Sequence, residues 1–502
     1  MTRATGSRAP GPDRRRPGTA TRLFFTVWLV YAIHATTNVA RETYLAMSIA
    51  EDFSVRVDRY LGLHPDLFEI EGRGSYINNN PGAGLLGAIP YLAARPALAL
   101  LFRLRPGLIA QKPPATYDDP RPNREPFLNL ARARGLDIKL GLAALVTGVG
   151  LMAPLGAAAA VLVFGFYRRR LDDERLALGI AVLYALVTPI FFRSAFLNQN
   201  AIVSHAVLGA ALLLLRPGAG NRTWVAVGGL LGLAVLNDYS GASMVPMFAA
   251  WVAYEGWTAA RVSGAAKAVV RFGLGASVPV LLLLGYQWVA FGNPMFPAQT
   301  YMPETSLSTS GWFGLSVPGL DLLWRNMLDP RFGLLIFCPM LAAAVAYPWS
   351  GPHPTRLQPH QAGFLAAAAA ALYLFSSANQ FAALQWNTGV RYLVPSGTLI
   401  FFLAVPVLLR MRPPLFRALV LPTAIISWSV AMTREAVPRA LAQVFGTGLE
   451  LPIHTVLEKT ASGYWPEVAD GTSPIAVFLV TGVILWLLWK DAPWDVAGGH
   501  GS

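Results

Sequence analysis

The chain has 502 residues, of which 54% are hydrophobic and 13% are charged, whereas a soluble domain is usually about 25% charged. This composition predicts an integral membrane protein and excludes an ordinary soluble domain. The net charge of +13 does not indicate a nucleic-acid partner, because 35 of the 40 basic residues are Arg and they lie between apolar runs, where they set topology. A single Cys338 excludes a disulfide framework and a cysteine-based metal site.

Three regions follow along the chain. Residues 1–22 are predicted to be a disordered basic cytoplasmic tail, residues 23–490 a transmembrane domain, and residues 491–502 a second cytoplasmic tail. The first apolar run lacks a cleavage site, so it is interpreted as an uncleaved span. Because a span needs about 17 to 25 apolar residues, we predict an all-α polytopic fold with about twelve spans. They fall near 23–40, 140–167, 176–192, 199–215, 223–239, 241–257, 272–291, 333–349, 361–378, 392–409, 416–432 and 474–489.

The arginines assign the two sides of the membrane. With the basic N-terminus inside, the inner connections are short and Arg-rich, and the short outer ones are not, which is the positive-inside pattern. Both termini are then cytoplasmic, and the two long connections, 41–138 and 433–473, are extracytoplasmic. We therefore predict a multi-pass protein of the bacterial cell envelope, in the plasma (inner) membrane. The short outer connections hold Arg193, Arg325, Arg331 and Arg391.

The first outer loop contains an apolar segment, residues 82–102, that is broken by Pro90, Arg95 and Pro96. If it crossed the bilayer, every later connection would invert and the Arg-rich loops would face outward. We therefore predict interfacial helices in this loop, lying on the outer leaflet. Residues 105–126 show no helical pattern and are predicted to be an exposed excursion.

Glu42 follows the first span by two residues and is the first candidate for chemistry. A carboxylate at the outer membrane surface can take a proton from a hydroxyl acceptor if partial desolvation tunes its pKa. The alternative is a helix-initiating Glu paired with Arg41 as an interfacial anchor, and on charge alone this alternative is favoured.

Three asparagines, Asn78, Asn79 and Asn80, precede Pro81 and an apolar helix. Asn caps helices and closes turns, and Pro suits a first helical turn. The functional alternative is a polar lip whose amides bind sugar hydroxyls or phosphate oxygens. The sequence leaves the two alternatives open.

Further polar residues are predicted at the outer ends of later spans, and this convergence on one face suggests a site there. Asp238 has the strongest claim, since intramembrane acids are costly and usually functional. The others have ordinary explanations: a hydrogen-bonded core residue, headgroup anchors and an interfacial aromatic. The candidates are His205, Asp238, Arg331, Trp386 and Arg391.

The order of these pieces carries a family resemblance between residues 23 and 410. An acid followed by Y-L-x-x-S-I-A-E, then R-x-S-Y-x-N-x-x-P-G-x-x-L-L, resembles the GT-C glycosyltransferases of the dolichyl-phosphate-mannose mannosyltransferase and aminoarabinose-transferase type. The segments FGNP, DPRFGLLIFCP and WNTGVRYLVP resemble recurrent segments of bacterial membrane proteins assigned to that group. This chain departs from the family in having Arg41 before a single acid, and Asn79 or Asn80 where the family has a basic residue.

The resemblance implies an inverting transferase that moves a sugar from a polyprenyl-phosphate donor to an acceptor hydroxyl of a glycolipid, polysaccharide or protein, on the extracytoplasmic face. It implies Glu42 as the catalytic base. Arg391 or Arg331 would clamp the phosphate, because a guanidinium pairs two phosphate oxygens at once.

No cofactor is required by the spacing, although Asp238 and Asn78 would suit a divalent cation. The alternatives are a lipid-linked saccharide flippase or transporter, which should show repeated halves and midplane charges, a membrane polysaccharide polymerase or ligase, and a family member without catalysis.

Overall fold

The computed structural model describes residues 17–36, 41–116, 124–218, 220–387, 389–454 and 474–492, without the side chains at 386 and 387. Most of both predicted tails and residues 455–473 of the second predicted outer loop lie outside the described residues.

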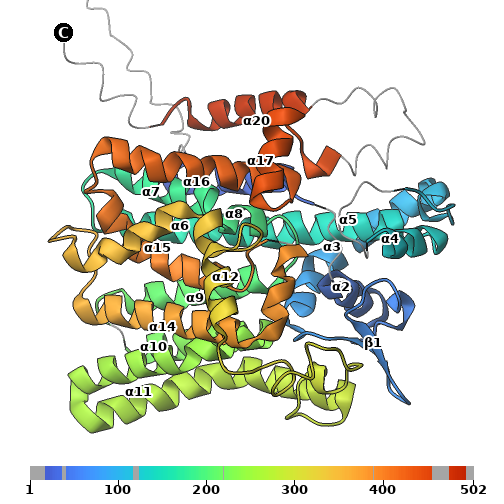
Figure 1. Ribbon diagram of the computed structural model, residues 1–502, viewed down its shortest axis with the longest axis horizontal. Helices are drawn as coiled ribbons and strands as arrows, with labels where there is room; N and C mark the ends of the chain where they lie inside the picture. The colour runs from blue at the N-terminus through green and yellow to red at the C-terminus, as the bar shows by residue number, and fades with distance from the viewer. Residues whose placement is uncertain are drawn as a thin grey trace, which may run out of the picture.

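The described chain is built almost entirely of helices (Figure 1). The first half contains α1 (Thr19–Ile33), α2 (Arg41–Asp52), α3 (Gly82–Leu104), α4 (Arg124–Ala133), α5 (Asp137–Thr147), α6 (Ala153–Arg168), α7 (Glu174–Val187), α8 (Ile190–Arg193), α9 (Gln199–Leu214) and α10 (Asn221–Asn237). The second half contains α11 (Val245–Phe291), α12 (Leu320–Leu328), α13 (Leu334–Phe337), α14 (Pro359–Ala378), α15 (Val394–Leu408), α16 (Pro413–Thr433), α17 (Val437–Gly446) and α20 (Pro474–Trp489).

Tighter 3₁₀ segments join some of these helices, and α5 continues into α6 through a π-helical turn at Gly148–Met152. The 3₁₀ segments are Asp58–Tyr60, Pro106–Ile109, Tyr239–Met244, Ala298–Thr300, Pro339–Trp349 and Gln380–Asn387.

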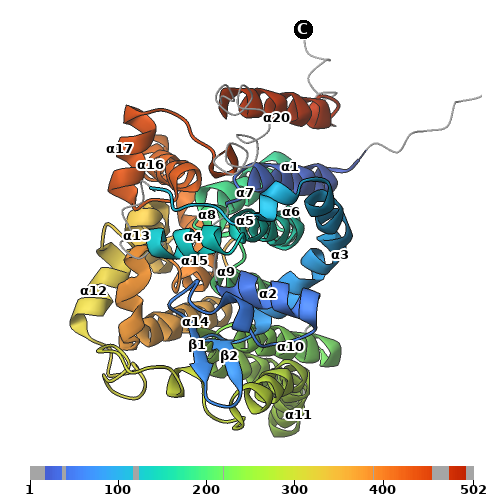
Figure 2. The ribbon, with the colours of Figure 1, turned by 90° about the vertical axis from the view of Figure 1, so that its right-hand side faces the viewer.

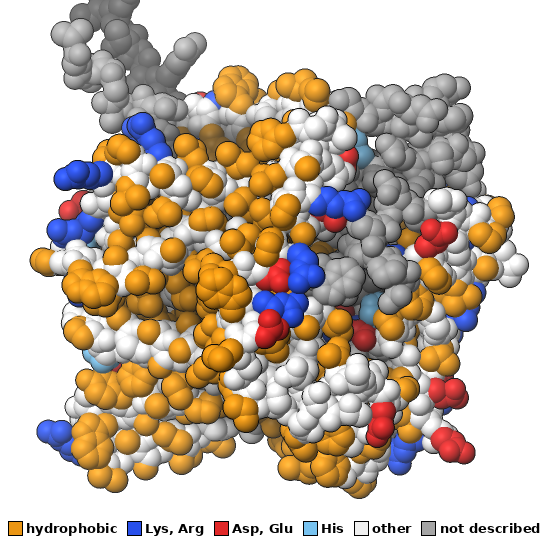
Figure 3. All heavy atoms as spheres, viewed as in Figure 1, with side chains coloured by type: hydrophobic (Ala, Val, Ile, Leu, Met, Phe, Trp, Pro, Cys, Tyr) orange, Lys and Arg blue, Asp and Glu red, His pale blue; other side chains and the backbone are white. Residues whose placement is uncertain are grey.

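Five described helical stretches are long and apolar enough to cross a membrane, and four apolar helices of 10–17 residues accompany them. In Figure 3 hydrophobic side chains dominate the left and centre of the molecule, with Lys and Arg along the left edge. The protein is therefore a helical membrane protein, while the number of twelve spans stays a prediction. The five stretches are Gly82–Leu104, Asp137–Arg168, Tyr239–Phe291, Pro359–Ala378 and Pro413–Thr433.

α11 is two helices joined by a sharp turn, because Ala260 and Arg261 have non-helical backbone angles. The two arms run side by side at the bottom of Figure 1. This turn lies in the predicted inner connection between 257 and 272.

A two-stranded antiparallel hairpin, β1 (Leu67–Ile70) and β2 (Gly74–Ile77), was not expected from the sequence. Its strands are four residues long, too short to give a clear period-2 pattern. The hairpin packs on the end of α11, where Phe68 and Tyr76 join Phe291 in one apolar cluster.

α3 covers residues 82–102, which the sequence predicts to lie on the outer leaflet. This placement stays a prediction, since α3 is also long and apolar enough to cross a membrane. The helix rises along one side of the view in Figure 2 and so runs across the direction that α11 and α14 follow in Figure 1. Its first turns pack closely on other segments, since a Cβ at Gly82 would lie 2.7 Å from Asn237 Cγ and one at Gly84 would lie 2.6 Å from a Leu45 methyl. The residue before the helix is Pro81, and no side chain caps the helix, so the asparagines do not take the capping role that was one of their two alternatives.

Candidate active site

Glu42 lies in the first turn of α2 with a side chain only 3% exposed. Arg41 Nε lies 3.2 Å from Glu42 Oε1, and the Arg41 guanidinium also pairs with Asp66. The pair with Arg41 that the sequence offered as an exposed anchor therefore exists, but it is buried. A buried carboxylate needs partners for its charge, and the helix N-terminus adds a favourable dipole.

Two amides complete the surroundings of Glu42. Asn79 Nδ2 donates to Glu42 Oε1 at 3.2 Å. With the Gln199 amide, at the start of α9, assigned in the orientation that satisfies its neighbours, its nitrogen donates to the same oxygen at 3.0 Å. Its amide oxygen then accepts from Asn79 at 2.6 Å and from Arg41 at 3.3 Å. All these contacts fall on Oε1, and Oε2 receives no hydrogen bond from the described residues. Among the described residues, one carboxylate oxygen is thus anchored and the other has no hydrogen-bond partner.

Asp66, which precedes β1, is the second acidic partner of Arg41. Burial raises the pKa of the Asp66 carboxyl, but Arg41 and the neighbouring cations lower it by more, so the pKa lies below its usual value. The Asp66 N–H donates to His64 Nδ1 at 3.1 Å, and burial lowers the pKa of His64. At neutral pH Asp66 is therefore charged and His64 is a neutral acceptor.

Between α7 and α9 the regular helix is interrupted inside the bundle. Every residue from 187 to 204 is buried. Buried backbone outside regular helix needs hydrogen-bond partners for its polar groups. Here other segments supply donors to its carbonyls. The bonds are Ser427 to Thr188 O at 3.4 Å, Arg434 to Phe192 O, and Thr36 N–H to Ala195 O at 3.1 Å.

Arg193 lies in this interrupted segment, and it is only 3% exposed. The guanidiniums of Arg193 and Arg434 lie 5.0 Å and 5.7 Å from the centroid of the Phe196 ring. Burial and the charges of Arg391 and Arg434 together lower the pKa of Arg193 to about 9, although Glu42 raises it. Arg193 therefore lies in a cluster of positive charge with Arg434 and Arg391.

Arg391 lies just before α15. Its Nη2 donates to Tyr392 Oη at 3.1 Å, and its guanidinium stands 4.8 Å from the Tyr392 ring centroid. Its charge lowers the pKa of both Asp66 and Arg193. Among the described residues, Arg391 forms no ion pair with an acid.

Other predicted residues lie nearby in different roles. Asn80 Nδ2 donates to Val235 O at 2.7 Å and ties the chain before α3 to α10. The Asn78 carbonyl accepts from the Gln299 amide at 2.9 Å. Asp238 caps the turn after α10 through Ser240 N–H at 2.8 Å, and its charge reaches Arg41.

Two predicted residues, Arg331 and His205, make no contact with Glu42 in the described part of the structure. Arg331 forms a two-point pair with Asp329 at 2.9 and 3.0 Å, so its guanidinium is already engaged. His205 lies further along α9, and neither ring nitrogen has a partner among the described residues. The side chain of Trp386 is outside the described residues. No group of three or more His, Cys, Asp and Glu suited to a metal occurs in the described part of the chain.

Reasoning from sequence missed three members of this site: Asp66, Arg193 and Gln199. The signal for Arg193 was present, since it is an arginine in the apolar run FFRSAF, and intramembrane charge marks function. Asp66 carries no such signal, because an acid in an outer loop is ordinary. Gln199 belongs to the polar residues at the outer ends of spans, but it has no charge that would single it out.

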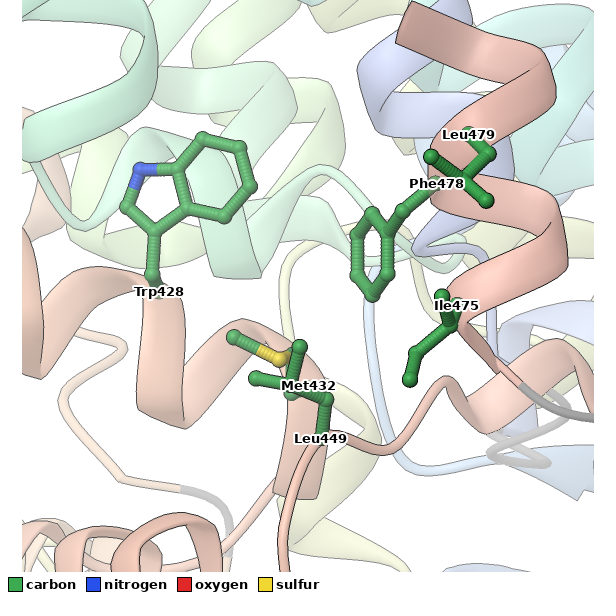
Figure 4. A pocket seen from close by; sticks show the side chains of 6 residues that line it. All are labelled: Trp428, Met432, Leu449, Ile475, Phe478 and Leu479. Atoms are coloured by element: carbon green, nitrogen blue, oxygen red, sulfur yellow. The ribbon is translucent and has the colours of Figure 1, made fainter.

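An apolar pocket of about 370 Å³ opens between α16 and α20 (Figure 4). It does not contain Glu42. The His34 ring nevertheless lies 5.4 Å from Trp428 and 6.1 Å from Phe478 of its wall, and the His34 carbonyl accepts from Arg434 at 2.9 Å. The wall of the pocket is therefore linked to Arg434 through His34. Its lining is Trp428, Met432, Leu449, Ile475, Phe478 and Leu479.

Comparisons with known proteins add one similarity. No family model matches the sequence, and no curated protein matches it significantly. Among solved structures, the chain is similar to ArnT from Cupriavidus metallidurans, bound to undecaprenyl phosphate, with 14% identity and a TM-score of 0.41 over 94% of this chain and 74% of that chain.

Proposed function

We propose that this protein is an inverting glycosyltransferase that moves a sugar from a polyprenyl-phosphate donor to an acceptor hydroxyl on the extracytoplasmic face of the membrane. The observation that carries the proposal is the buried Glu42, anchored through Oε1 while Oε2 has no hydrogen-bond partner among the described residues, beside a group of buried or half-buried arginines. A base and an anion site side by side are what such a displacement needs.

Glu42 Oε2 takes the acceptor proton as the acceptor oxygen bonds to the anomeric carbon. The bond from that carbon to the phosphate oxygen breaks, and the phosphate leaves with the electron pair. Because Arg41, Asn79 and Gln199 hold Oε1, the carboxylate cannot rotate away. A fixed base of this kind typically contributes a factor of about 10² to 10⁴.

Arg391 and Arg193 stabilise the departing phosphate. A phosphodiester donor carries one negative charge, whereas a monoester product carries about 1.5 to 2 at neutral pH. The arginines therefore interact more strongly with the leaving group than with the donor, which is the condition for lowering the barrier. The Asp66 carboxylate balances the charge of Arg41, which remains paired with Glu42.

The apolar pocket suits part of the polyprenyl chain. Its wall is made of apolar and aromatic side chains, and its His34 side leads to Arg434. An isoprenoid chain in the pocket would place its phosphate near the arginines, with the sugar toward Glu42.

A flippase is the second candidate. The buried charge of Arg193 favours it to some extent, since transporters place such groups inside the bundle. Glu42, with one anchored oxygen and one that has no partner among the described residues, favours catalysis instead, because moving a lipid requires no base.

The test uses purified protein in nanodiscs with a panel of radiolabelled polyprenyl-phosphate sugars and a membrane glycolipid extract. Transfer of label to an acceptor is expected for at least one donor. A parallel liposome assay measures donor translocation. Translocation without transfer across the panel would overturn the enzyme proposal in favour of the flippase.

A further inference from the structure

A chain of three buried polar side chains ends at the backbone of Arg391. Gln385, in the 3₁₀ segment Gln380–Asn387, is fully buried. Its Oε1 accepts from two successive backbone N–H groups, Arg391 at 3.1 Å and Tyr392 at 3.0 Å. Its Nε2 donates to Asn326 Oδ1 at 3.0 Å, so every polar atom of this amide is bonded.

The chain continues into two helices. Asn326 of α12 is 1% exposed, and its Nδ2 donates to the fully buried Ser377 Oγ of α14 at 3.1 Å. Ser377 and its neighbours also bind the preceding loop, where Gly319 N–H donates to Ser377 O at 3.2 Å. The start of α15 is therefore tied through side chains to the ends of α12 and α14.

The two N–H groups that Gln385 binds precede α15, whose first residue is Val394. Buried N–H groups without partners are costly. No backbone carbonyl binds either of these N–H groups among the described residues, so Gln385 is their acceptor. This amide fixes where the backbone turns, and hence where the Arg391 guanidinium points.

We propose that Gln385, supported by Asn326 and Ser377, is a positioning residue that holds Arg391 and Tyr392 for recognition of the donor phosphate. This inference rests on the function proposed above. Gln385 acts through the backbone of Arg391 and does not touch the donor itself. The relay joins α12, α14 and α15, so donor affinity depends on how these three segments pack.

Gln385→Met is the test variant, because it keeps the length of the side chain and removes both the acceptor and the donor. Gln380→Met is the matched control. Gln380 lies in the same segment, and its Nε2 donates to Ser316 at 2.7 Å instead. Both variants are compared with Arg391→Ala and with the double variant Gln385→Met/Arg391→Ala.

Two measurements are made in nanodiscs: amide hydrogen exchange across residues 389–395, and binding of a polyprenyl monophosphate. Gln385→Met should speed exchange at the Arg391 and Tyr392 amides and weaken binding about tenfold, the effect of losing about one good hydrogen bond. Gln380→Met should change neither. In the double variant, Gln385→Met should add little to Arg391→Ala, whereas a merely structural residue would add its full effect.

Unchanged exchange at the two amides, or fully additive losses in the double variant, would overturn the inference. If the wild type binds no polyprenyl phosphate while Gln385→Met still speeds exchange, the proposed function fails and the hydrogen-bond relay stands without it.

Discussion

Replacing Glu42 by Gln tests the catalytic base directly. The Gln amide oxygen can still accept from Asn79 and Gln199 in place of Oε1, and its NH₂ group would occupy the position of Oε2. The change thus keeps the shape and the anchoring contacts, and it removes the ability to take a proton.

The expected magnitude follows from these contacts. Loss of a positioned base should lower kcat by about 10² to 10⁴, which is about 3 to 5 kcal/mol in the activation free energy. The folding cost should be smaller, about 1 to 2 kcal/mol, because hydrogen bonds to a neutral group are weaker than those to a charged one and Arg41 keeps Asp66 as its counterion. Removing a negative charge beside the arginines should not raise KM for the donor.

The assay measures initial rates of sugar transfer at several donor concentrations, with thermal unfolding in detergent as the check on folding. Glu69→Gln is the matched control, since Glu69 lies in the same loop on β1 and is exposed. Transfer by Glu42→Gln within about tenfold of the wild type would refute the reasoning, because a positioned base contributes more than that.

Three further predictions follow from other parts of the molecule. Arg391→Ala should raise KM for the donor and also lower kcat, as seen in the same transfer assay, because the arginine contacts the phosphate both before and during departure; a change in neither would remove it from the site. In a Cys338→Ser background, an impermeant thiol reagent on intact cells should label Thr116→Cys and spare Asp172→Cys, and the reverse pattern would overturn the topology. Burial raises the pKa of Glu51, but hydrogen bonds and ion pairs from Lys139, Tyr91 and Arg59 outweigh it, so the pKa lies below its usual value of 4.5. The stabilising contribution of Glu51 is therefore present above pH 4.5 and is lost as the pH falls through the lowered pKa. Acid unfolding followed by tryptophan fluorescence should show a smaller loss of stability at low pH in Glu51→Gln than in the wild type.

The sequence by itself determined the class of protein. Long apolar runs and arginines between them depend only on local composition, because each span must satisfy its own backbone within the bilayer. For the same reason the turn inside α11 was expected between two separate apolar runs. Glu42 stood out because the predicted spans are almost free of ionisable groups, so each acid at a span end is weighed individually, although the sequence alone favoured an exposed ion pair.

The tertiary structure decided the rest, since its contacts join residues far apart in the chain. Gln199 reaches Glu42 only because the break between α7 and α9 turns the start of α9 toward α2. Arg331 and Arg391 look alike in sequence, since each enters a helix after a turn. In the structure, however, the Arg331 guanidinium is paired with Asp329, whereas the Arg391 backbone is bound by Gln385. Local sequence patterns show which residues prefer water or lipid. Which polar groups share one buried site depends on how the helices pack, because in a buried site the charges and hydrogen bonds must be satisfied by one another.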